Sequence, residues 1–348
     1  MKRLYAIKNI DYTTVISGKR ILKANYLKFF RILHADKCII FKSLFMPFFS
    51  VIMPLYNKEA FVLEAVNSVL QQTFTDFELL VVDDASTDNS VAVVSEITDN
   101  RLKIIRNPEN LNLPKSRNVG IAAATGTFVA FLDSDDKWEP NFLAEIFQMT
   151  ETFPNQVVYA TSYFKWFSDS FRGPNAALNR ENRTQIITNF FEKAVGESPY
   201  CSSSLAIRKD KMQALGGYNE AVTFGEDIDL CIRLHAIHPL VFNPKPLAWY
   251  RQNESGQMTM SSISKKVHTP FSNYEKDFGN VPGLKKYLNF HRYALLMAAI
   301  REKNDLVANK YQLEIDLRDL DFKRKLLCVM SRTLVRWALR FRELRNRG

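Results

Sequence analysis

Three carboxylates follow directly after one of the most apolar runs in the chain. Residues 128–132 have the pattern of a strand buried on both faces, and Asp133, Ser134, Asp135 and Asp136 come next. Because open α/β sheets bind ligands at the carboxyl ends of their strands, this cluster is a candidate site. Crowded carboxylates repel one another unless a cation lies between them, and a hard divalent ion with oxygen ligands is the usual solution. The alternative is an Asp-rich turn that caps the next helix, and the cluster alone favours neither reading.

Two further acidic pairs could take part in the same chemistry. Asp83 and Asp84 follow the apolar residues 77–82, so we expect them at the same sheet edge. A carboxylate at the end of the second strand contacts a ribose or a base edge in many nucleotide-binding folds, and a helix cap is the alternative. Glu226 and Asp227 are expected to open a helix, where acidic residues are also common because the helix dipole favours them. Each pair by itself therefore leaves a purely structural explanation open.

The elements that would position these clusters alternate along the chain. From residue 48 to residue 132, strand-like runs alternate with segments of helical spacing, which predicts an α/β fold with a mostly parallel central sheet flanked by helices. The expected strands are 48–56, 77–84, 102–106 and 128–132, and the expected helices are 58–71, 88–97 and 114–124. Beyond residue 140 we expect strands at 157–164 and 203–207, helices at 141–149, 209–215 and 226–235, a loop at 168–183, and helices from about residue 265 onward.

The composition is that of a folded protein. Its 348 residues are 46% hydrophobic and 24% charged, which excludes wholesale disorder, and the length allows one large domain or two. The four cysteines are scattered without metal-finger spacing, which suits a reducing compartment. The best candidate for a membrane span, 38–56, is interrupted by Lys42, Pro47 and Pro54, so we expect no spanning helix. We expect no signal peptide either, because the basic N-terminus lacks a continuous apolar region.

The net charge of +10 is concentrated at the two ends of the chain. Residues 1–46 carry ten Lys/Arg against two Asp, and residues 323–348 carry nine against one Glu, so each end has a net charge of +8. Residues 326–345 are expected to form one amphipathic helix with arginines opposite its apolar side, and residues 21–33 suggest a second. Such helices are typical of anionic membrane surfaces, which we favour. The alternative is packing on the folded domain or on a second protomer, and no motif supports nucleic acid as a partner.

Three blocks of the chain together resemble the family 2 glycosyltransferases. They are VIMPLYNKEAFVLEAVNSVLQQTFTDFELLVVDDASTDNS, SRNVGIAAATGTFVAFLDSDDKWEP and LGGYNEAVTFGEDIDLCIRL, in the order and at the spacings of that family. The resemblance covers about residues 48–255 and implies a GT-A fold, which is Rossmann-like. It also implies transfer of a sugar from a nucleotide sugar with inversion. We therefore expect a GT-A domain over 47–265, between a basic N-terminal extension over 1–46 and a C-terminal helical region over 266–348.

The resemblance implies a nucleotide-sugar site when its residues are carried over by position. Pro54, Tyr56 and Asp84 would line the nucleobase pocket. Glu59 would lie nearby, and Arg117 would face the diphosphate. UDP is the expected nucleotide by family habit.

The resemblance also implies roles for the acidic residues. The sequence Asp133-Ser134-Asp135 is the family's DxD element, in which Asp135 would bind Mg²⁺ or Mn²⁺ and Asp133 would contact the ribose or the metal. A metal there would stabilise the diphosphate leaving group as its negative charge grows. Asp227 would be the general base, and Glu226 would contact the acceptor or position the base. The helix N-terminus is expected to lower the pKa of Asp227.

The chain departs from the family pattern at two points. Asn112 stands at a turn where the family often has glycine, and we expect it to adopt a left-handed conformation there. The tetrapeptide Tyr250-Arg251-Gln252-Asn253 lacks the histidine of the corresponding family element.

The expected function is therefore an inverting glycosyltransferase of cell-surface polysaccharide biosynthesis. It would act on a glycan or a polyprenol-linked acceptor, as a peripheral protein in contact with anionic lipid at the cytoplasmic face of the membrane. The alternative, which the missing histidine keeps open, is a sugar-nucleotide-binding or scaffold protein without turnover.

Overall fold

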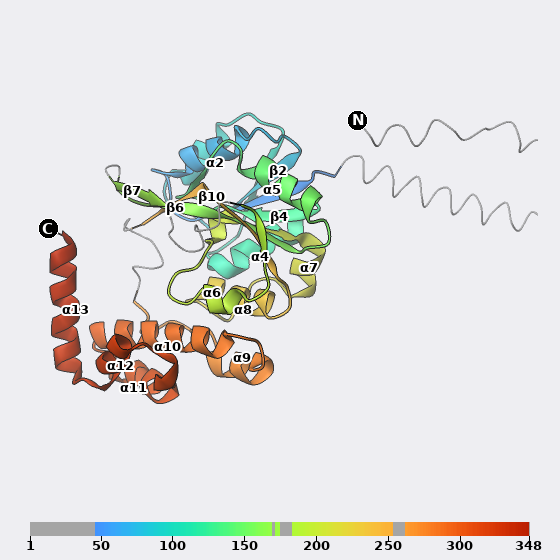
Figure 1. Ribbon diagram of the computed structural model, residues 1–348. Helices are drawn as coiled ribbons and strands as arrows, with labels where there is room; N and C mark the ends of the chain where they lie inside the picture. Colours follow the sequence, from blue (N-terminus) through green and yellow to red (C-terminus); the bar gives the residue numbers. More distant parts are fainter. Residues whose placement is uncertain (1–45, 169–170, 175–182, 253–261, 348) are drawn as a thin grey trace, which may run out of the picture. The chain divides into compact units, whose positions relative to one another are not determined.

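The fold is organised around a sheet of ten strands in the part of the chain that this computed structural model describes, residues 46–168, 171–174, 183–252 and 262–347 (Figure 1). The strands are β1 (Phe49–Leu55), β2 (Phe77–Asp83), β3 (Leu102–Arg106), β4 (Phe128–Phe131), β5 (Lys137–Trp138), β6 (Val158–Ser168), β7 (Phe171–Pro174), β8 (Gln185–Ile187), β9 (Leu205–Arg208) and β10 (Leu240–Arg251). Their order is β3-β2-β1-β4-β9-β6-β10-β5, with β7 paired to β6 and β8 paired to β10.

The central part of the sheet is mostly parallel, as the sequence predicts. β1 pairs in parallel with β2 and β4, and β2 pairs in parallel with β3. β6 and β10 form another parallel pair. β9 is antiparallel to both β4 and β6, and it joins the two parallel groups. The predicted α/β fold class is therefore confirmed.

The order in which successive strands are added to the sheet reverses at β1. β2 and β3 extend the sheet on one side of β1, whereas β4 pairs on the other side. The carboxyl ends of β1, β2 and β4 therefore meet at a topological switch point, where α/β sheets bind their ligands. Leu55 is in register with Asp83 at this edge, and β4 ends two residues before Asp133.

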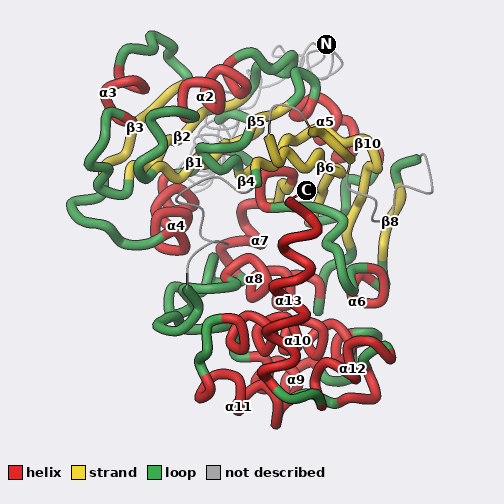
Figure 2. The backbone as a smooth tube through the Cα atoms, turned by 90° about the vertical axis from the view of Figure 1, so that its left-hand side faces the viewer, coloured by secondary structure: helices red, strands yellow, loops and turns green. Residues whose placement is uncertain are grey.

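Helices cover both faces of the sheet (Figures 1 and 2). They are α2 (Val62–Leu70), α3 (Ser90–Ser95), α4 (Leu113–Ala123), α5 (Phe142–Thr152), α6 (Phe190–Lys193), α7 (Lys209–Ala214), α8 (Glu226–His235), α9 (Phe271–Phe278), α10 (Leu284–Arg301), α11 (Asp305–Glu314), α12 (Phe322–Val329) and α13 (Arg332–Arg347).

The alternation of side chains along β1 divides the interior into two cores. Val51 and Met53 point to the core that contains α2 and α5, and Ile52 points to the core that contains α4 and α8. The second core continues into the C-terminal helices through Leu288 and Leu296 of α10. The C-terminal helices therefore share a hydrophobic core with one face of the sheet.

The sheet contains four strands that were not expected from the sequence. The longest strand, β10, was not expected, because Pro244 and Pro246 argue against a strand; register shifts against β6 between Asn243 and Ala248 accommodate them. The expected loop over 168–183 is wrong at β7, which pairs with β6. The short strands β5 and β8 were not expected either. The other strands follow the predicted ones to within a few residues at each end.

The C-terminal amphipathic pattern forms two helices, so the expectation of one helix over 326–345 is wrong. α12 ends before Met330, and Ser331 begins α13 by accepting a hydrogen bond from Leu334 N at its Oγ, at 3.5 Å. Serine favours this cap position and therefore favours a new helix start. No helix within the described ranges has the length and hydrophobicity needed to cross a membrane. The other predicted amphipathic segment, 21–33, lies outside the described residues.

α13 contacts the neighbouring helices through two of its arginines. Arg336 Nε donates to the carbonyl of Ile300 in α10 at 3.0 Å, and Arg332 pairs with Asp305 of α11. In contrast, 53% of Leu334 and 69% of Trp337 are exposed. Arg332 and Arg336 therefore pack on the neighbouring helices, and part of the apolar side of α13 faces solvent.

Candidate active site

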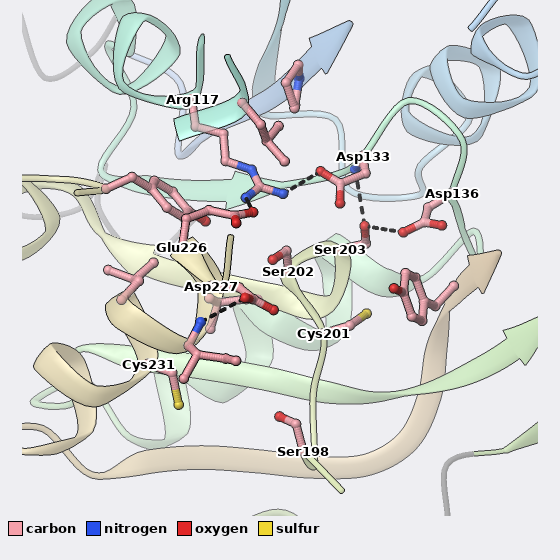
Figure 3. A pocket seen from close by; sticks show the side chains of 18 of the residues that line it. Arg117, Asp133, Asp136, Ser198, Cys201, Ser202, Ser203, Glu226, Asp227 and Cys231 are labelled. Carbon is pink, nitrogen blue, oxygen red and sulfur yellow. Dashed lines mark hydrogen bonds and ion pairs between the residues drawn. The ribbon is translucent and has the colours of Figure 1, made fainter. Parts of the chain in front are cut away.

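A cavity of about 580 Å³ lies at the carboxyl ends of β1, β2 and β4 (Figure 3). The predicted site residues in its wall are Pro54, Tyr56, Asp84, Arg117, Asp133, Ser134, Asp135, Glu226 and Asp227. Glu59 lies outside this wall, where its carboxylate accepts a hydrogen bond from Asn89 N at 3.0 Å near the start of α3. The fold thus gathers all the predicted site residues except Glu59 around one space.

Arg117 joins the two halves of the cavity (Figure 3). Its Nη2 is 2.7 Å from Asp133 Oδ1 and its Nη1 is 3.2 Å from Glu226 Oε1, although Asp133 and Glu226 are 93 positions apart. The side chain is 2% exposed. Burial opposes its charge, but the carboxylates of Asp133 and Glu226 and the hydroxyl of Tyr218 outweigh burial and raise the pKa of Arg117. A buried guanidinium with two carboxylate partners holds the acidic turn and the start of α8 together.

The carboxylates after β4 have separate partners. Asp135 Oδ2 is 2.7 Å from Lys58 Nζ, which is mostly buried. Asp136 lies deeper, where it accepts hydrogen bonds from Ser203 Oγ at 2.5 Å and from Arg251 N at 2.9 Å. Burial and the neighbouring charges of Asp135 and Asp133 raise the pKa of Asp136 well above its ordinary value. Asp136 therefore anchors the turn, whereas Asp133 and Asp135 carry its exposed charge.

Arg251, at the end of β10, contacts this turn and α2 and holds the turn in place. Its Nε donates to the carbonyl of Asp135 at 3.0 Å, and its Nη2 pairs with Glu64 of α2 at 3.0 Å. The guanidinium also lies 3.8 Å from the ring centroid of Trp166 and 4.6 Å from that of Phe61. These contacts give the acidic turn a fixed position relative to the sheet.

The acidic pair at the start of α8 has two different environments. Glu226 is buried; burial and the charge of Asp227 raise its pKa to about 7, although Arg117 acts in the opposite direction. Asp227 is exposed toward the cavity and accepts a hydrogen bond from Ile228 N at 2.8 Å. The expected lowering of the Asp227 pKa is wrong: loss of solvent outweighs the backbone donors and raises the pKa. A raised pKa makes Asp227 a stronger base than an ordinary aspartate.

Asp84 organises the opposite end of the cavity. Its Oδ1 accepts hydrogen bonds from Asn107 Nδ2 and Leu111 N, both at 2.8 Å, and its Oδ2 accepts one from Asn112 N at 3.0 Å. The side chain is buried, and it fixes the loop that leads into α4. Tyr56, by contrast, is 45% exposed at the rim of the cavity.

Asn112 occupies a conformation that suits glycine better than asparagine. Its φ of 73° is positive, as expected, but its ψ of 159° lies outside the left-handed helical region. This combination is nearly restricted to glycine, and it costs another residue about 1–3 kcal/mol. The hydrogen bond from Asn112 N to Asp84 holds the strained residue in place.

Three residues of the site were not predicted from the sequence. Lys58, Ser203 and Arg251 each contact the turn after β4. Arg251 belongs to the family element that lacks its histidine, so the sequence marked this position but assigned no function to Arg251. Single lysine and serine residues on surface-type segments carry no such signal, and only the tertiary fold brings them to the acidic turn.

The carboxylates of Asp133 and Asp135 suit a metal ion whose coordination shell is completed by a bound ligand. Among the described residues, no group of three or more His, Cys, Asp and Glu side chains is arranged to hold a metal ion. Asp133 and Asp135 nevertheless line one cavity, and each already attracts a cationic side chain. Mg²⁺ commonly takes one or two protein carboxylates and completes its shell with substrate phosphates and water. This pair therefore suits a cation that binds together with a diphosphate.

Comparison with known proteins agrees with this geometry. The model of the family described as Glycosyl transferase family 2 matches residues 50–216. The UDP-Glc:alpha-D-GlcNAc-diphosphoundecaprenol beta-1,3-glucosyltransferase WfgD of Escherichia coli is 45% identical over 94 residues, which are 27% of this chain and 37% of WfgD. The putative glycosyltransferase EpsE of Bacillus subtilis is 29% identical over 194 residues, 54% of this chain and 66% of EpsE. The domain over residues 50–216 belongs to glycosyltransferase family 2.

Solved structures show the fold of this chain. TarS 1-349 of S. aureus, in complex with UDP-GlcNAc, aligns with a TM-score of 0.62 at 19% identity, over 84% of this chain and 91% of that chain. The mannosyltransferase PcManGT of Pyrobaculum calidifontis, in complex with GDP-Man and Mn²⁺, aligns with a TM-score of 0.53 at 18% identity, over 83% and 81%. The fold is therefore GT-A. The segment that matches the family ends before α8, so Glu226, Asp227 and all of α10 lie beyond it.

The strain at Asn112 predicts that Asn112→Gly stabilises the protein. Glycine adopts the observed angles freely but adds entropy to the unfolded chain, so we expect the free energy of unfolding to rise by about 1 kcal/mol in urea denaturation. Asn155→Gly is the matched control, because Asn155 is exposed and is not among the residues with positive φ. That control should lose about 0.5 kcal/mol. Equal losses in both variants would contradict the strain.

The raised pKa of Glu226 predicts a pH-dependent stability. The stabilising contribution of the neutral carboxyl is complete below its ordinary pKa of 4.5 and is lost as the pH rises toward about 7. Glu226→Gln lacks this titration, so it should gain about 3 kcal/mol relative to the wild type across that interval. Urea denaturation of both proteins at several pH values measures the gap. A gap that does not change with pH would show that Glu226 is ionised throughout.

Proposed function

We propose that this protein is an inverting glycosyltransferase. Its donor is a nucleoside diphosphate sugar, with UDP as the first nucleotide to test, and its acceptor is a hydroxyl group of a glycan or of a polyprenol-linked sugar. The product belongs to cell-surface polysaccharide. The observation that carries this proposal is the bridge from Asp133 through Arg117 to Glu226, because it puts the leaving-group side and the base side of a transfer reaction in one cavity.

The reaction is a single displacement at the anomeric carbon. The acceptor oxygen forms a bond to that carbon while the bond from the carbon to the β-phosphate oxygen breaks, and the bonding electron pair leaves with the nucleoside diphosphate. The acceptor proton passes to the carboxylate of Asp227. This carboxylate is exposed toward the cavity, and its raised pKa makes it a better proton acceptor. Attack opposite the leaving group inverts the anomeric carbon.

The leaving group gains negative charge and needs a cation. Asp133 and Asp135 would hold Mg²⁺ or Mn²⁺, which supplies Lewis-acid stabilisation of the diphosphate when it is bound. Lys58 adds a second positive charge on the same side, 2.7 Å from Asp135. The ion pairs of Arg117 keep Asp133 and Glu226 in position during the transfer. Pro54, Tyr56 and Asp84 would form the nucleobase end, and Ser134, which belongs to the acidic turn, lines the same cavity.

The related proteins support the substrate classes. WfgD takes its name from a UDP-Glc donor and a diphosphoundecaprenol-linked acceptor, and TarS was solved with UDP-GlcNAc. PcManGT was solved with GDP-Man and Mn²⁺, so both UDP and GDP donors belong in the screen. Because this chain matches 37% of WfgD, the donor and the acceptor of WfgD enter only as candidates.

Two substitutions test the roles of the carboxylates. Asp227→Asn removes the base, so transfer should fall by about 10²–10⁴-fold while UDP binding persists. Asp135→Asn should abolish turnover and weaken the Mn²⁺ dependence of UDP binding. Release of UDP from a panel of UDP and GDP sugars, with Mg²⁺ or Mn²⁺, measures turnover, and calorimetry measures UDP binding.

Asp76→Asn is the control for both substitutions, because Asp76 is an exposed aspartate in the loop before β2. Full activity in Asp227→Asn or in Asp135→Asn would contradict the role of that residue. Nucleotide binding without turnover, under any donor and acceptor, would instead favour the scaffold alternative.

We further propose peripheral contact with the anionic cytoplasmic face of a membrane. The most C-terminal segment, 323–348, carries nine Lys/Arg against one Glu, and apolar side chains of α12 and α13 are exposed beside them. The exposed fractions are 82% for Phe322, 66% for Val329 and 69% for Trp337. Apolar insertion together with attraction to anionic lipid is the usual basis of interfacial binding. Because Arg332 and Arg336 pack on α10 and α11, other basic residues of this segment would face the lipid.

Membrane contact predicts that Trp337→Glu weakens binding to phosphatidylglycerol vesicles by about tenfold, because an apolar anchor becomes a charge of the wrong sign. Leu63→Glu is the matched control, since Leu63 is an exposed apolar residue of α2. Vesicle co-sedimentation at low and high salt measures binding, and salt should weaken it. Equal binding of both variants, or no vesicle binding by the wild type, would refute this contact.

A further inference from the structure

The cavity continues past the acidic pair to an aromatic face of α10. Tyr287, Phe290 and His291 all line it, and their spacing of three and four residues puts them on one side of that helix. This face lies outside the segment that matches the family, 50–216. Part of the cavity wall therefore comes from α10, a helix that the family match does not cover.

The aromatic face lies close to Asp227. Cys231 is four residues after Asp227 on α8, so the two side chains are about 5–6 Å apart on the same side of that helix. Cys231 Sγ and Tyr287 Oη are 3.5 Å apart and share a hydrogen bond. The charge of Asp227 also contributes to the raised pKa of Tyr287. One helical turn therefore separates the carboxylate from the first aromatic ring of α10.

His291 has ring nitrogens that no described residue satisfies. Its ring centroid lies 4.4 Å from that of Tyr287 and 5.4 Å from that of Phe290, so aromatic neighbours hold the imidazole in place. No hydrogen bond joins its nitrogens to another residue in the described part of the chain. Burial lowers the pKa of His291 to about 4, so the imidazole is neutral at physiological pH. A neutral imidazole offers one donor and one acceptor, which suits a hydroxyl-rich ligand.

The order of groups along the cavity identifies which substrate this end receives. Figure 3 shows Asp133 and Asp136 on one side of Asp227, and Cys231 and Ser198 on the other side. In the proposed reaction the diphosphate lies at Asp133, and the acceptor must approach the anomeric carbon from the opposite side. The end of the cavity beyond Asp227, toward α10, is therefore the acceptor side.

We infer that Tyr287, Phe290 and His291 form the binding wall for the acceptor, and that the acceptor group is an uncharged sugar ring. This inference rests on the proposed function. The rings of Phe290 and Tyr287 supply an apolar surface for the C–H face of the sugar, and His291 orients its hydroxyl groups. A hydroxyl of a ring against this wall lies within reach of Asp227.

The charges beside the wall disfavour an anionic sugar. Asp227 and Glu197 both line the cavity, and Glu197 pairs with Lys165. Arg324, whose guanidinium lies 4.9 Å from the centroid of Phe290, pairs with Asp321. Because the cations near the wall are already paired with carboxylates, a uronic acid there would be repelled more than it is attracted.

Saturation-transfer NMR tests this wall in the full-length protein with UDP and Mg²⁺, which is diamagnetic. The probes are methyl glucoside, methyl N-acetylglucosaminide and methyl glucuronide. We expect the ring protons of at least one neutral probe to receive saturation and those of the glucuronide to receive none. Phe290→Ala and His291→Ala should each weaken the binding of the neutral probe by about fivefold, without a change in UDP binding. His291→Phe keeps the packing but loses the hydrogen bonds, so it should also bind the probe more weakly, and unfolding curves confirm that each variant is folded.

Lys286→Ala is the matched control, because Lys286 is exposed on α10 and does not line the cavity. It should behave as the wild type. The acceptor wall is overturned if the neutral probes bind Phe290→Ala and His291→Ala as well as they bind the wild type. It is also overturned if the glucuronide binds as well as the neutral probes, or if the wild type binds UDP but no neutral probe. Absence of UDP binding in the wild type would instead refute the proposed function, so the two failures are distinguishable.

Discussion

The buried guanidinium of Arg117 is the interaction on which the rest of the site depends. It comes from α4, and it binds a carboxylate that follows β4 and a carboxylate that opens α8. Arg117 and Glu226 are both buried, so water cannot replace either partner in that ion pair, whereas Asp133 remains partly exposed. Removing one member of a buried ion pair leaves an uncompensated charge, which typically destabilises a protein by about 3–5 kcal/mol. The same contact therefore stabilises the fold and sets the distance between the two chemical halves of the cavity.

The sheet explains why these groups meet at all. Its order reverses at β1, so the carboxyl ends of β1, β2 and β4 open at one edge. Asp84 and the turn after β4 both follow strands of this parallel group, and Arg251 at the end of β10 braces the turn from the other part of the sheet. α8 and α10 then close the cavity from the face that the C-terminal helices cover. The C-terminal helices are thus part of the site, because they share a core with the sheet.

Some errors of sequence interpretation have clear physical causes. Two prolines hide β10, since proline cannot donate to a strand ladder and the sheet must shift its register to include them. The amphipathic C-terminus forms two helices because Ser331 caps a new start. Arg336 and Arg332 of α13 contact α10 and α11, and sequence periodicity does not reveal these partners. The pKa of Asp227 rises because desolvation outweighs the helix N-terminus.

The sequence by itself determined the strands and helices of the first half, the acidic ends of two strands, and the acidic start of α8, because these depend on local periodicity and on residues that are adjacent in the chain. The family resemblance added the expectation that they act together. Only the tertiary structure decided that Arg117 bridges Asp133 and Glu226, that Lys58 and Ser203 reach the acidic turn, and that α10 contributes an aromatic wall. These contacts join positions that are far apart in the sequence, and their energies depend on burial and on neighbouring charges, which local sequence patterns do not encode.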